Sequence, residues 1–212
     1  MPPDASATRS KLLDAAAKAF AEHGVANASL LDITRQAGQR NRGALHYHFG
    51  SRDGVLVGVL ERHADFLAQR EGELLEAARK TPDDDIAAVV GAIVRPAVEL
   101  AESGWRGRCC LMIIADLTEA DPHDLAPEVQ EALARTGGFA VYDVLAERLP
   151  PMPEDVRDER LALMTNFILR AVSDRARLLG SRRKGRPQLD HDRFVDNLIA
   201  MIAAAVAAPP LT

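Results

Sequence analysis

The sequence predicts an all-α fold, and three observations support this prediction. Apolar residues make up 47% of the 212 residues, whereas aromatic residues make up only 4%, so packing between aliphatic helices must form the core. Alanine and leucine are abundant and apolar residues recur at helical spacing. The sequence contains no alternating apolar and polar segment and no Asn-Gly hairpin signal that would require a strand.

Residues 29–49 predict two short helices joined by a tight turn. Ser29 is a suitable N-cap for the first helix, and Asp32 completes a capping-box pattern. Gly38 can adopt a positive φ, which allows the chain to leave that helix sharply. The second helix is expected to begin near Asn41. Two helices at a steep angle, the second short and basic, have the shape that fits a DNA major groove.

The segments on both sides strengthen this interpretation. Residues 8–23 form an amphipathic pattern that Gly24 ends, which predicts a supporting helix. Residues 50–53 cap a long apolar-striped helix that should run over 52–78. We therefore predict a DNA-binding head at 7–53, a connecting helix at 52–78 and a helical body at 81–208.

The body is expected to contain further helices separated by proline and glycine breaks. The chain should break at 81–85, where the acidic run 83–85 should cap the first of them, and Pro96 should kink that helix. The expected helices cover 86–102, 105–117, one helix from about 126 to 149, 155–179, and a last helix that Asp190 caps and Pro209 ends. The basic loop at 180–187 fits a solvated connection better than a second nucleic-acid contact.

Charge is unevenly distributed along the chain, whose formal net charge is −5. Residues 1–54 hold seven Lys or Arg against five Asp or Glu, whereas the remaining residues hold 19 against 26. A mildly basic head on an acidic body would keep attraction to phosphates local. This distribution argues against a protein that coats DNA nonspecifically.

The predicted head and the start of the connecting helix resemble the TetR family of transcriptional regulators. The resemblance covers about the first third of the chain and lies in Leu13-Asp14-Ala15-Ala16, Phe20, Gly24, Asp32-Ile33, Ala37-Gly38, Gly43-Ala44-Leu45-His46-Tyr47-His48-Phe49 and Ser51-Arg52-Asp53. Two departures stand out. Gln39-Arg40-Asn41 makes the stretch before Gly43 one residue longer than the family pattern, and Leu31 replaces a residue that tends to be polar.

Side-chain chemistry assigns expected roles within the head. The candidate DNA contacts are Ser29, Gln39, Arg40, Asn41, Arg42, Tyr47, His48 and Arg52. Among them, Arg40, Asn41 and Arg42 suit base edges, because Arg pairs with guanine and Asn with adenine. Ser29, Tyr47 and Arg52 suit phosphates.

The family resemblance implies a ligand-responsive homodimeric repressor that binds a palindromic operator on double-stranded DNA. The last two helices carry apolar residues over a wide arc, so we expect the dimer interface there, at Phe167, Phe194, Leu198 and Ile202. The expected effector is a small apolar molecule. Candidate pocket residues are Trp105, Met112, Phe139, Tyr142 and Phe167, although an ordinary core role fits each of them as well.

Other function classes find less support in the sequence. A helical enzyme or lipid-binding module that merely retains the head would need a nucleophile, a metal set or paired carboxylates, and no such constellation is present. His46 and His48 lie two residues apart, which places them on different sides of a helix rather than on one metal. We therefore expect no catalytic residues, metal or cofactor. No apolar run approaches the ~20 residues of a membrane-spanning helix, so we expect a cytoplasmic protein.

Overall fold

The structure is a computed structural model that describes residues 5–41, 43–179 and 187–210, and every regular element in these ranges is helical. The predicted all-α fold is thereby confirmed. The elements are α1 (Ala5–His23), α2 (Leu30–Gln36), α3 (Ala44–Phe49), α4 (Arg52–Ala78), α5 (Ile86–Glu102), α6 (Trp105–Glu119), a 3-10 turn (Pro122–Asp124), α7 (Pro127–Ala134), α8 (Phe139–Arg148), α9 (Glu154–Leu179) and α10 (His191–Ala207). None of the described helices is long and apolar enough to cross a membrane.

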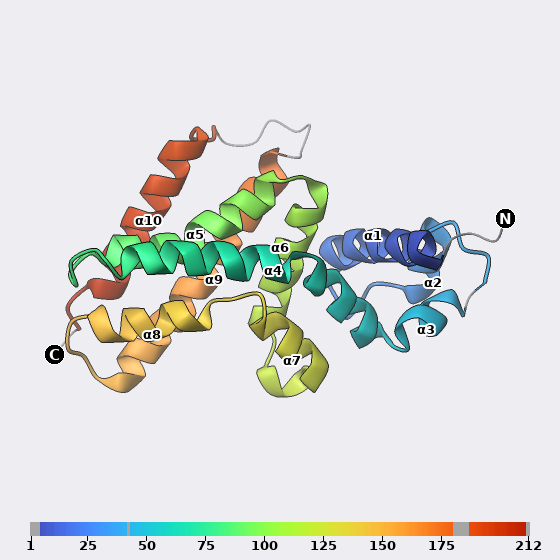
Figure 1. Ribbon diagram of the computed structural model, residues 1–212, viewed down its shortest axis with the longest axis horizontal. Coiled ribbons are helices and arrows are strands. Elements are labelled where there is room, and N and C mark those ends of the chain that lie inside the picture. Colours follow the sequence, from blue (N-terminus) through green and yellow to red (C-terminus); the bar gives the residue numbers. More distant parts are fainter. Residues whose placement is uncertain (1–4, 42, 180–186, 211–212) are drawn as a thin grey trace.

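The helices α1, α2 and α3 form a small lobe at one end of the molecule, and α4 leads from it into the body (Figure 1). The centre of this lobe is aliphatic, with one aromatic ring. Its largest fully buried side chains are Leu12, Leu13, Phe20, Ile33, Val55 and Leu56. Apolar burial on one face of each short helix compensates for the low stability of such helices in isolation.

Local capping fixes where the helices of the head begin and end. The Ser29 hydroxyl accepts the N–H of Asp32 at 3.3 Å, and the Ser51 hydroxyl accepts the N–H of Gly54 at 3.0 Å. Gly38 has a φ of 72°, in the left-handed region that lets a chain leave a helix sharply. These contacts confirm the predicted N-cap at Ser29, the turn at Gly38 and the cap before the connecting helix.

The helix α3, the second of the helix-turn-helix pair, begins three residues later than predicted. Asn41 belongs to the preceding turn, where its side-chain oxygen accepts the N–H of Gly43 at 2.9 Å. Asn side chains readily make such local bonds, which compete with helix formation. The additional residue before Gly43 therefore lengthens the turn and leaves α3 short.

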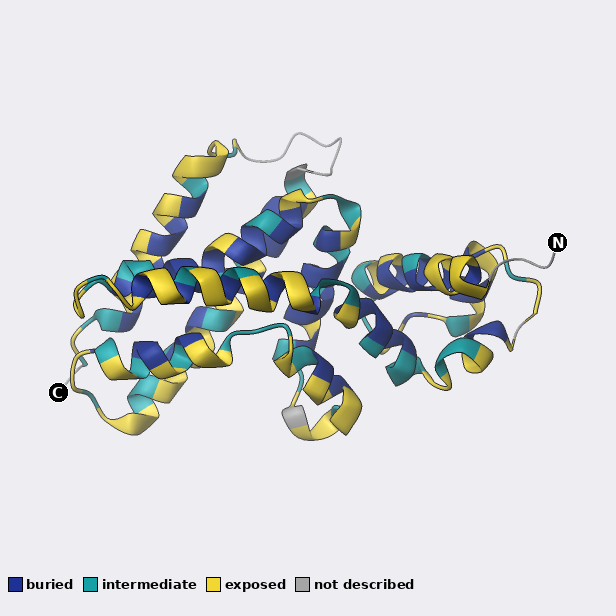
Figure 2. Cartoon of the chain, viewed as in Figure 1, coloured by how far each residue is buried: buried dark blue, intermediate teal, exposed yellow. Residues whose placement is uncertain are grey.

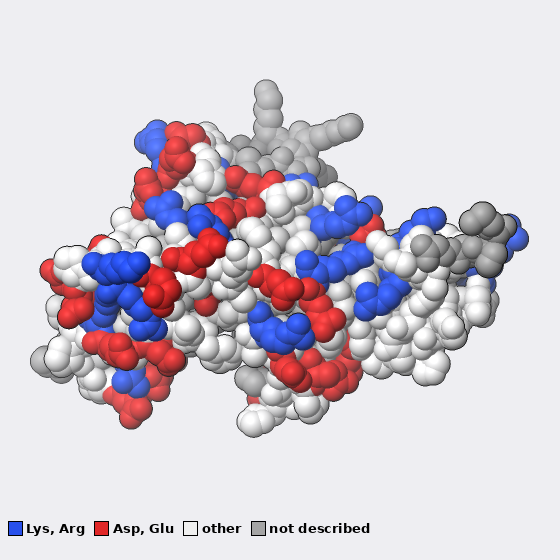
Figure 3. Space-filling model, in the orientation of Figure 1, with Lys and Arg blue, Asp and Glu red and all other residues white. Residues whose placement is uncertain are grey.

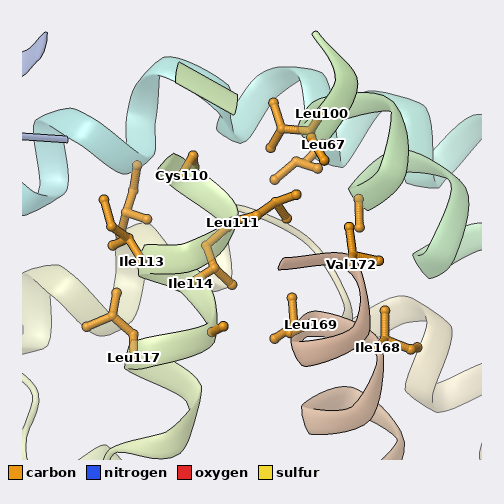
Figure 4. Packing of buried hydrophobic residues seen from close by; sticks show 14 of the residues in the cluster. Leu67, Leu100, Cys110, Leu111, Ile113, Ile114, Leu117, Ile168, Leu169 and Val172 are labelled. Atoms are coloured by element: carbon orange, nitrogen blue, oxygen red, sulfur yellow. The ribbon is translucent and has the colours of Figure 1, made fainter. Parts of the chain in front are cut away.

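The body surrounds α5, whose buried residues run along almost its whole length (Figure 2). It packs against α4, α6, α8, α9 and α10. Between α6 and α9, Leu111 and Ile114 face Leu169 and Val172 (Figure 4). This central position of α5 explains why its sequence is the most uniformly apolar of the body helices.

The structure contains two helices where the sequence predicted one. A single helix was expected from about residue 126 to 149, but the chain breaks between α7 and α8 at Gly137 and Gly138. Both glycines have a φ of 102°, which an L-residue rarely adopts. Two consecutive glycines in this conformation turn the chain and allow α8 to start in a new direction.

Two residues expected at a dimer interface are buried within one chain instead. Leu198 and Ile202 of α10 are 4% and 2% exposed, because α10 packs on α5. Phe194 is half-buried beneath the Arg175 guanidinium, 4.3 Å from its ring centre. Leu198 and Ile202 thus complete the core of the chain and offer almost no surface to a partner, whereas Phe194 is partly covered.

The break at Gly137 gives a stability prediction. We expect Gly137→Ala to lower the free energy of unfolding by about 1–3 kcal/mol, because φ is unfavourable for alanine and the new Cβ would lie 2.7 Å from a Glu71 carboxylate oxygen. Gly72→Ala is the matched control: it lies within helix α4 with open space around it, and should stabilise by about 0.5–1 kcal/mol. Urea unfolding at one fixed protein concentration measures both. Equal stability of Gly137→Ala and the wild type would contradict the strained conformation.

Candidate DNA-binding surface and effector pocket

The end of the head presents an exposed surface built by α2, α3 and the turn between them. Tyr47 of α3 is 83% exposed, and its ring meets the ring of His48 edge-on at 5.1 Å between centroids. Arg40 and Asn41 are exposed in the turn, and Gln39 is half-buried. A shallow hollow of about 470 Å³ lies between this turn and Leu31. An exposed aromatic ring beside a basic turn is suited to contact with a nucleic acid.

The predicted contact residues are not equally available. The Asn41 side-chain oxygen is occupied by the N–H of Gly43, whereas Arg40 extends into solvent. The Ser29 hydroxyl is occupied as the N-cap of α2. Arg42 lies outside the described residues. Within the described part of the surface, Arg40 and Tyr47 are thus the side chains most free to reach DNA.

Arg52 holds the head together from within. Its guanidinium donates to the carbonyl oxygen of Val25 at 2.6 Å, which ties the start of α4 to the loop between α1 and α2. The side chain is half-buried, so at least one of its five N–H groups is committed to the protein. Arg52 was predicted as a phosphate contact, and the structure gives it this additional internal bond.

Charge on the visible face follows the predicted asymmetry. Figure 3 shows Lys and Arg side chains and uncharged surface with few Asp or Glu toward the head end, whereas over the body Asp and Glu side chains lie among Lys and Arg. Repulsion between the acidic body and DNA phosphates would favour an approach through the head.

Ion pairs join the head to the body at the junction of α1, α4 and α6. Asp14 of α1 accepts bonds from Arg62 at 2.7 Å and from Arg106 at 2.5 Å. The hydrogen bond from Arg106 is the largest cause that lowers the pKa of the Asp14 carboxyl group, and it outweighs the opposing effect of burial. One carboxylate therefore links three helices.

Trp105 and Met112 lie on the head side of α6 and not in the predicted effector pocket. The Trp105 ring contacts the charged groups of Lys18 and Arg106, which lie 4.5 and 4.6 Å from its centre. Met112 lines a separate small hollow of about 120 Å³ that includes Phe20 of α1. Farther along α6, Asp116 accepts the N–H of Val25 at 3.0 Å. One face of α6 thus contacts the head.

The opposite side of α6 borders a large cavity of about 720 Å³ in the body. Its walls come from α4, α5, α6, α7, α8 and α9, and they are mostly apolar. The lining includes Leu67, Ile93, Pro96, Leu111, Ile114, Leu117, Leu133, Leu161 and Leu169. A cavity of this size, with few polar groups, is suited to a small apolar molecule.

Only two of the five predicted pocket residues line this cavity. Phe139 and Tyr142, both on α8, contribute to its wall, whereas Trp105 and Met112 face the head. Phe167 is not among the lining residues and is 46% exposed on the surface of α9. Large side chains mark apolar regions in general, and their sequence alone does not distinguish a cavity wall from a helix junction or an open surface.

Sequence reasoning missed the buried carboxylate of the cavity, Glu71. It is 9% exposed and accepts the N–H of Gly138 at 2.9 Å on one oxygen and 2.8 Å on the other. Burial raises the pKa of Glu71, and the hydrogen bond from Gly138 opposes this shift. A signal was available, since Glu71 interrupts the apolar stripe of α4 four residues after Leu67 and four before Leu75.

Two hydroxyl groups meet beside Glu71. The Tyr142 hydroxyl contacts the Thr165 hydroxyl, which joins α8 to α9. Burial is the largest cause that raises the pKa of Tyr142. Within the described residues, no group of His, Cys, Asp and Glu is arranged to hold a metal ion.

Comparison with known proteins matches both parts of the chain. Residues 12–59 match the family of bacterial regulatory proteins called tetR, and residues 91–205 match a tetracyclin repressor-like C-terminal domain. Over 57 residues, 27% of this chain, the sequence is 42% identical to the HTH-type transcriptional regulators SrpR and TtgW, both of Pseudomonas putida. The matched stretch spans only 26% of SrpR and 42% of TtgW.

Solved structures share the fold over nearly the whole chain. AibR, solved with isovaleryl coenzyme A and operator DNA, is 14% identical with a TM-score of 0.55, over 92% of this chain and 97% of that one. FadR of Bacillus halodurans is 13% identical with a TM-score of 0.53, over 95% of each chain. PfmR of Thermus thermophilus is 19% identical with a TM-score of 0.51, over 92% and 96%.

The C-terminal match alone covers more than half of the chain, and the N-terminal match falls on the head described above. The helix-turn-helix of α2 and α3 is the DNA-binding element of this type of protein. The chain belongs to the TetR family of transcriptional regulators, which are DNA-binding proteins and not enzymes.

Proposed function

We propose that this protein is a ligand-responsive homodimeric repressor whose two heads bind a palindromic operator. One observation carries the proposal: the walls of the 720 Å³ cavity include α4 and α6, and the same two helices hold the head. A molecule in the cavity therefore touches the elements that set the position of the head.

The coupling rests on the two faces of α6. Leu111 and Ile114 line the cavity, whereas Arg106 and Asp116 bond to the head. A ligand releases the operator only if it binds more tightly to the arrangement whose head spacing does not fit DNA. Among proteins of this fold, AibR has been solved with isovaleryl coenzyme A and operator DNA together, which is a precedent for two such sites in one chain.

Dimerisation would bring two heads to successive turns of the DNA, about 34 Å apart. We assign the interface to the exposed apolar residues of α9 and α10. Leu163 and Phe167 lie one turn apart on α9 and are 57% and 46% exposed, and Met201 of α10 is 50% exposed. Exposed apolar side chains that recur along neighbouring helices are typical of a surface that a second copy covers.

In the DNA complex, we assign Arg40 to a base edge and Tyr47 to a phosphate. Arg40→Ala should cost about 1–3 kcal/mol of operator binding and relax preference at one base pair, because a bidentate guanine contact is lost. Tyr47→Phe should weaken all sequences alike by about 0.5–1.5 kcal/mol, because it removes one hydroxyl hydrogen bond. Gel shifts with DNA from the region upstream of its own gene, and with single-base variants of it, measure both effects.

The control for these variants is Lys80→Ala, which removes an exposed positive charge just beyond the far end of α4. It should leave operator affinity unchanged at every salt concentration. If Arg40→Ala weakens all sequences equally, our assignment of Arg40 to a base edge is wrong. If neither head variant changes binding, the surface formed by α2, α3 and their turn is not the contact.

The dimer assignment predicts different results for exposed and buried positions. Phe167→Glu should give folded monomers, because it places an unpaired charge in the interface. Phe66→Glu is the control, since Phe66 is 41% exposed on α4, and it should remain dimeric. Leu198→Glu should instead unfold the body, because Leu198 belongs to the core of one chain. Sedimentation equilibrium at micromolar concentration, with circular dichroism for folding, decides: an intact Phe167→Glu dimer would move the interface elsewhere.

A further inference from the structure

The hydroxyl groups that line the large cavity donate their hydrogen bonds to other groups of the protein. Thr118 and Thr165 donate to carbonyl oxygens of their own helices at 3.1 and 2.9 Å, and Thr136, just after α7, donates to the carbonyl oxygen of Leu133 at 2.6 Å. Since the Thr165 hydrogen goes to its backbone acceptor, the Tyr142 hydroxyl must be the donor in its contact with Thr165. The amide side chains of the lining, Gln130 and Asn166, belong to exposed residues. What these hydroxyls offer a ligand is therefore lone pairs.

The charged side chains among the described lining residues are all acidic. Glu71 and Asp158 are the ionisable acids among the described lining residues, and these residues include no Lys, Arg or His. Asp158 is exposed to solvent, which screens its charge, whereas Glu71 is 9% exposed. The field inside the cavity is consequently dominated by one buried carboxyl group.

The backbone is shaped to admit that carboxyl group. A Cβ at Gly137 would lie 2.7 Å from one Glu71 oxygen, closer than such atoms approach in real proteins. The glycine pair thus lets Glu71 reach the N–H of Gly138 at the start of α8. A carboxylate can accept about four hydrogen bonds, and this N–H supplies one. The remaining lone pairs are available to a molecule in the cavity.

We infer that the effector of this cavity is an apolar amine, whose ammonium group donates to Glu71 while its hydrocarbon part fills the space lined by Leu67, Ile114 and Leu169. The inference rests on the proposed effector function and names the class of ligand. An arriving positive charge favours the ionised form of Glu71 and so offsets the cost of its burial. Charge-assisted hydrogen bonds of this kind are about twice as strong as neutral ones.

The same arrangement disfavours acidic ligands. A fatty acid or a coenzyme A thioester would bring negative charge to a cavity whose charged lining groups are carboxylates and whose hydroxyl groups supply acceptor lone pairs, with amide donors only on the exposed residues Gln130 and Asn166. A buried anion without a donor or a positive partner is strongly destabilised. Ligand choice here therefore differs from that of AibR, the fold relative solved with isovaleryl coenzyme A.

Three probes with one hydrocarbon chain test the inference on the full-length protein: octylammonium, 1-octanol and octanoate, titrated by calorimetry. Octylammonium should bind about 10-fold or more tightly than octanol, and octanoate more weakly than octanol. Glu71→Gln should reduce octylammonium affinity by about 10-fold and change octanol affinity by less than about 2-fold. The glutamine oxygen can still accept the Gly138 N–H, so the start of α8 keeps its partner.

Asp158→Asn is the matched control, because it removes the exposed carboxylate of the same lining and should keep the preference for the amine. Equal binding of all three probes, tightest binding of octanoate, or an unchanged amine preference in Glu71→Gln would overturn the inference and leave an apolar effector pocket standing. Absence of binding by every probe would overturn both the inference and the effector function. Operator gel shifts with saturating octylammonium test the proposed function separately. If octylammonium binds tightly through Glu71 but leaves operator affinity unchanged, the ligand class is supported and the proposed release of DNA by the ligand is refuted.

Discussion

The position of the head depends on one carboxylate. Asp14 pairs with Arg62 of α4 and Arg106 of α6, so a single side chain of α1 fixes the head to both helices that enter the body. Without these pairs, α4, the packing of α1 on α6 and the bond from Val25 to Asp116 would still connect head and body, but the charged groups of Arg62 and Arg106 would lose their shared partner. In the proposed dimer, a loosened junction would leave the two recognition surfaces at a less defined separation, and joint binding to two half-sites would be weakened. Defined spacing is thus an electrostatic property of the junction as much as a property of the helix.

The helix α6 links this junction to the cavity because its two faces serve different partners. Trp105 and Asp116 contact the head, and Leu111 and Ile114 border the cavity. Where α6 packs directly on α1, a small shift of α6 would displace the side chains of the head that contact it. The requirement on the proposed effector is therefore geometric: it must prefer one position of α6 over another.

Much of the fold follows from local sequence signals. The bounds of α4 and α5 match the predicted ones, because caps at Ser51 and Asp85 and long apolar stripes leave no competing solution. Sequence alone did not give the start of α3, where Asn41 binds the backbone of Gly43 and competes with the helix. It also did not give the break at Gly137, because Val129, Leu133 and Val144 continue a helical stripe across it. Local periodicity carries no information on such turns when the apolar pattern on both sides stays in phase.

Site residues were harder to predict because exposure and orientation depend on tertiary packing. Trp105, Phe139 and Phe167 are equally apolar in the sequence, yet one joins head to body, one lines the cavity and one lies on the surface. Glu71 was overlooked because a carboxylate within a helix is usually a solvated residue. Its burial becomes evident only when α8 is seen to begin beside it.

The glycine break between α7 and α8 also separates one wall of the cavity from the contacts that hold the head. Because α8 packs mainly on α5, the wall that carries Phe139 and Tyr142 has no share in the junction at Asp14. Substitutions on that wall can alter which molecules fit while leaving the attachment of the head intact. Selectivity for the proposed effector on the α8 wall is therefore separable from the attachment of the head, whereas Glu71 belongs to α4, the helix that also carries Arg62 of the junction.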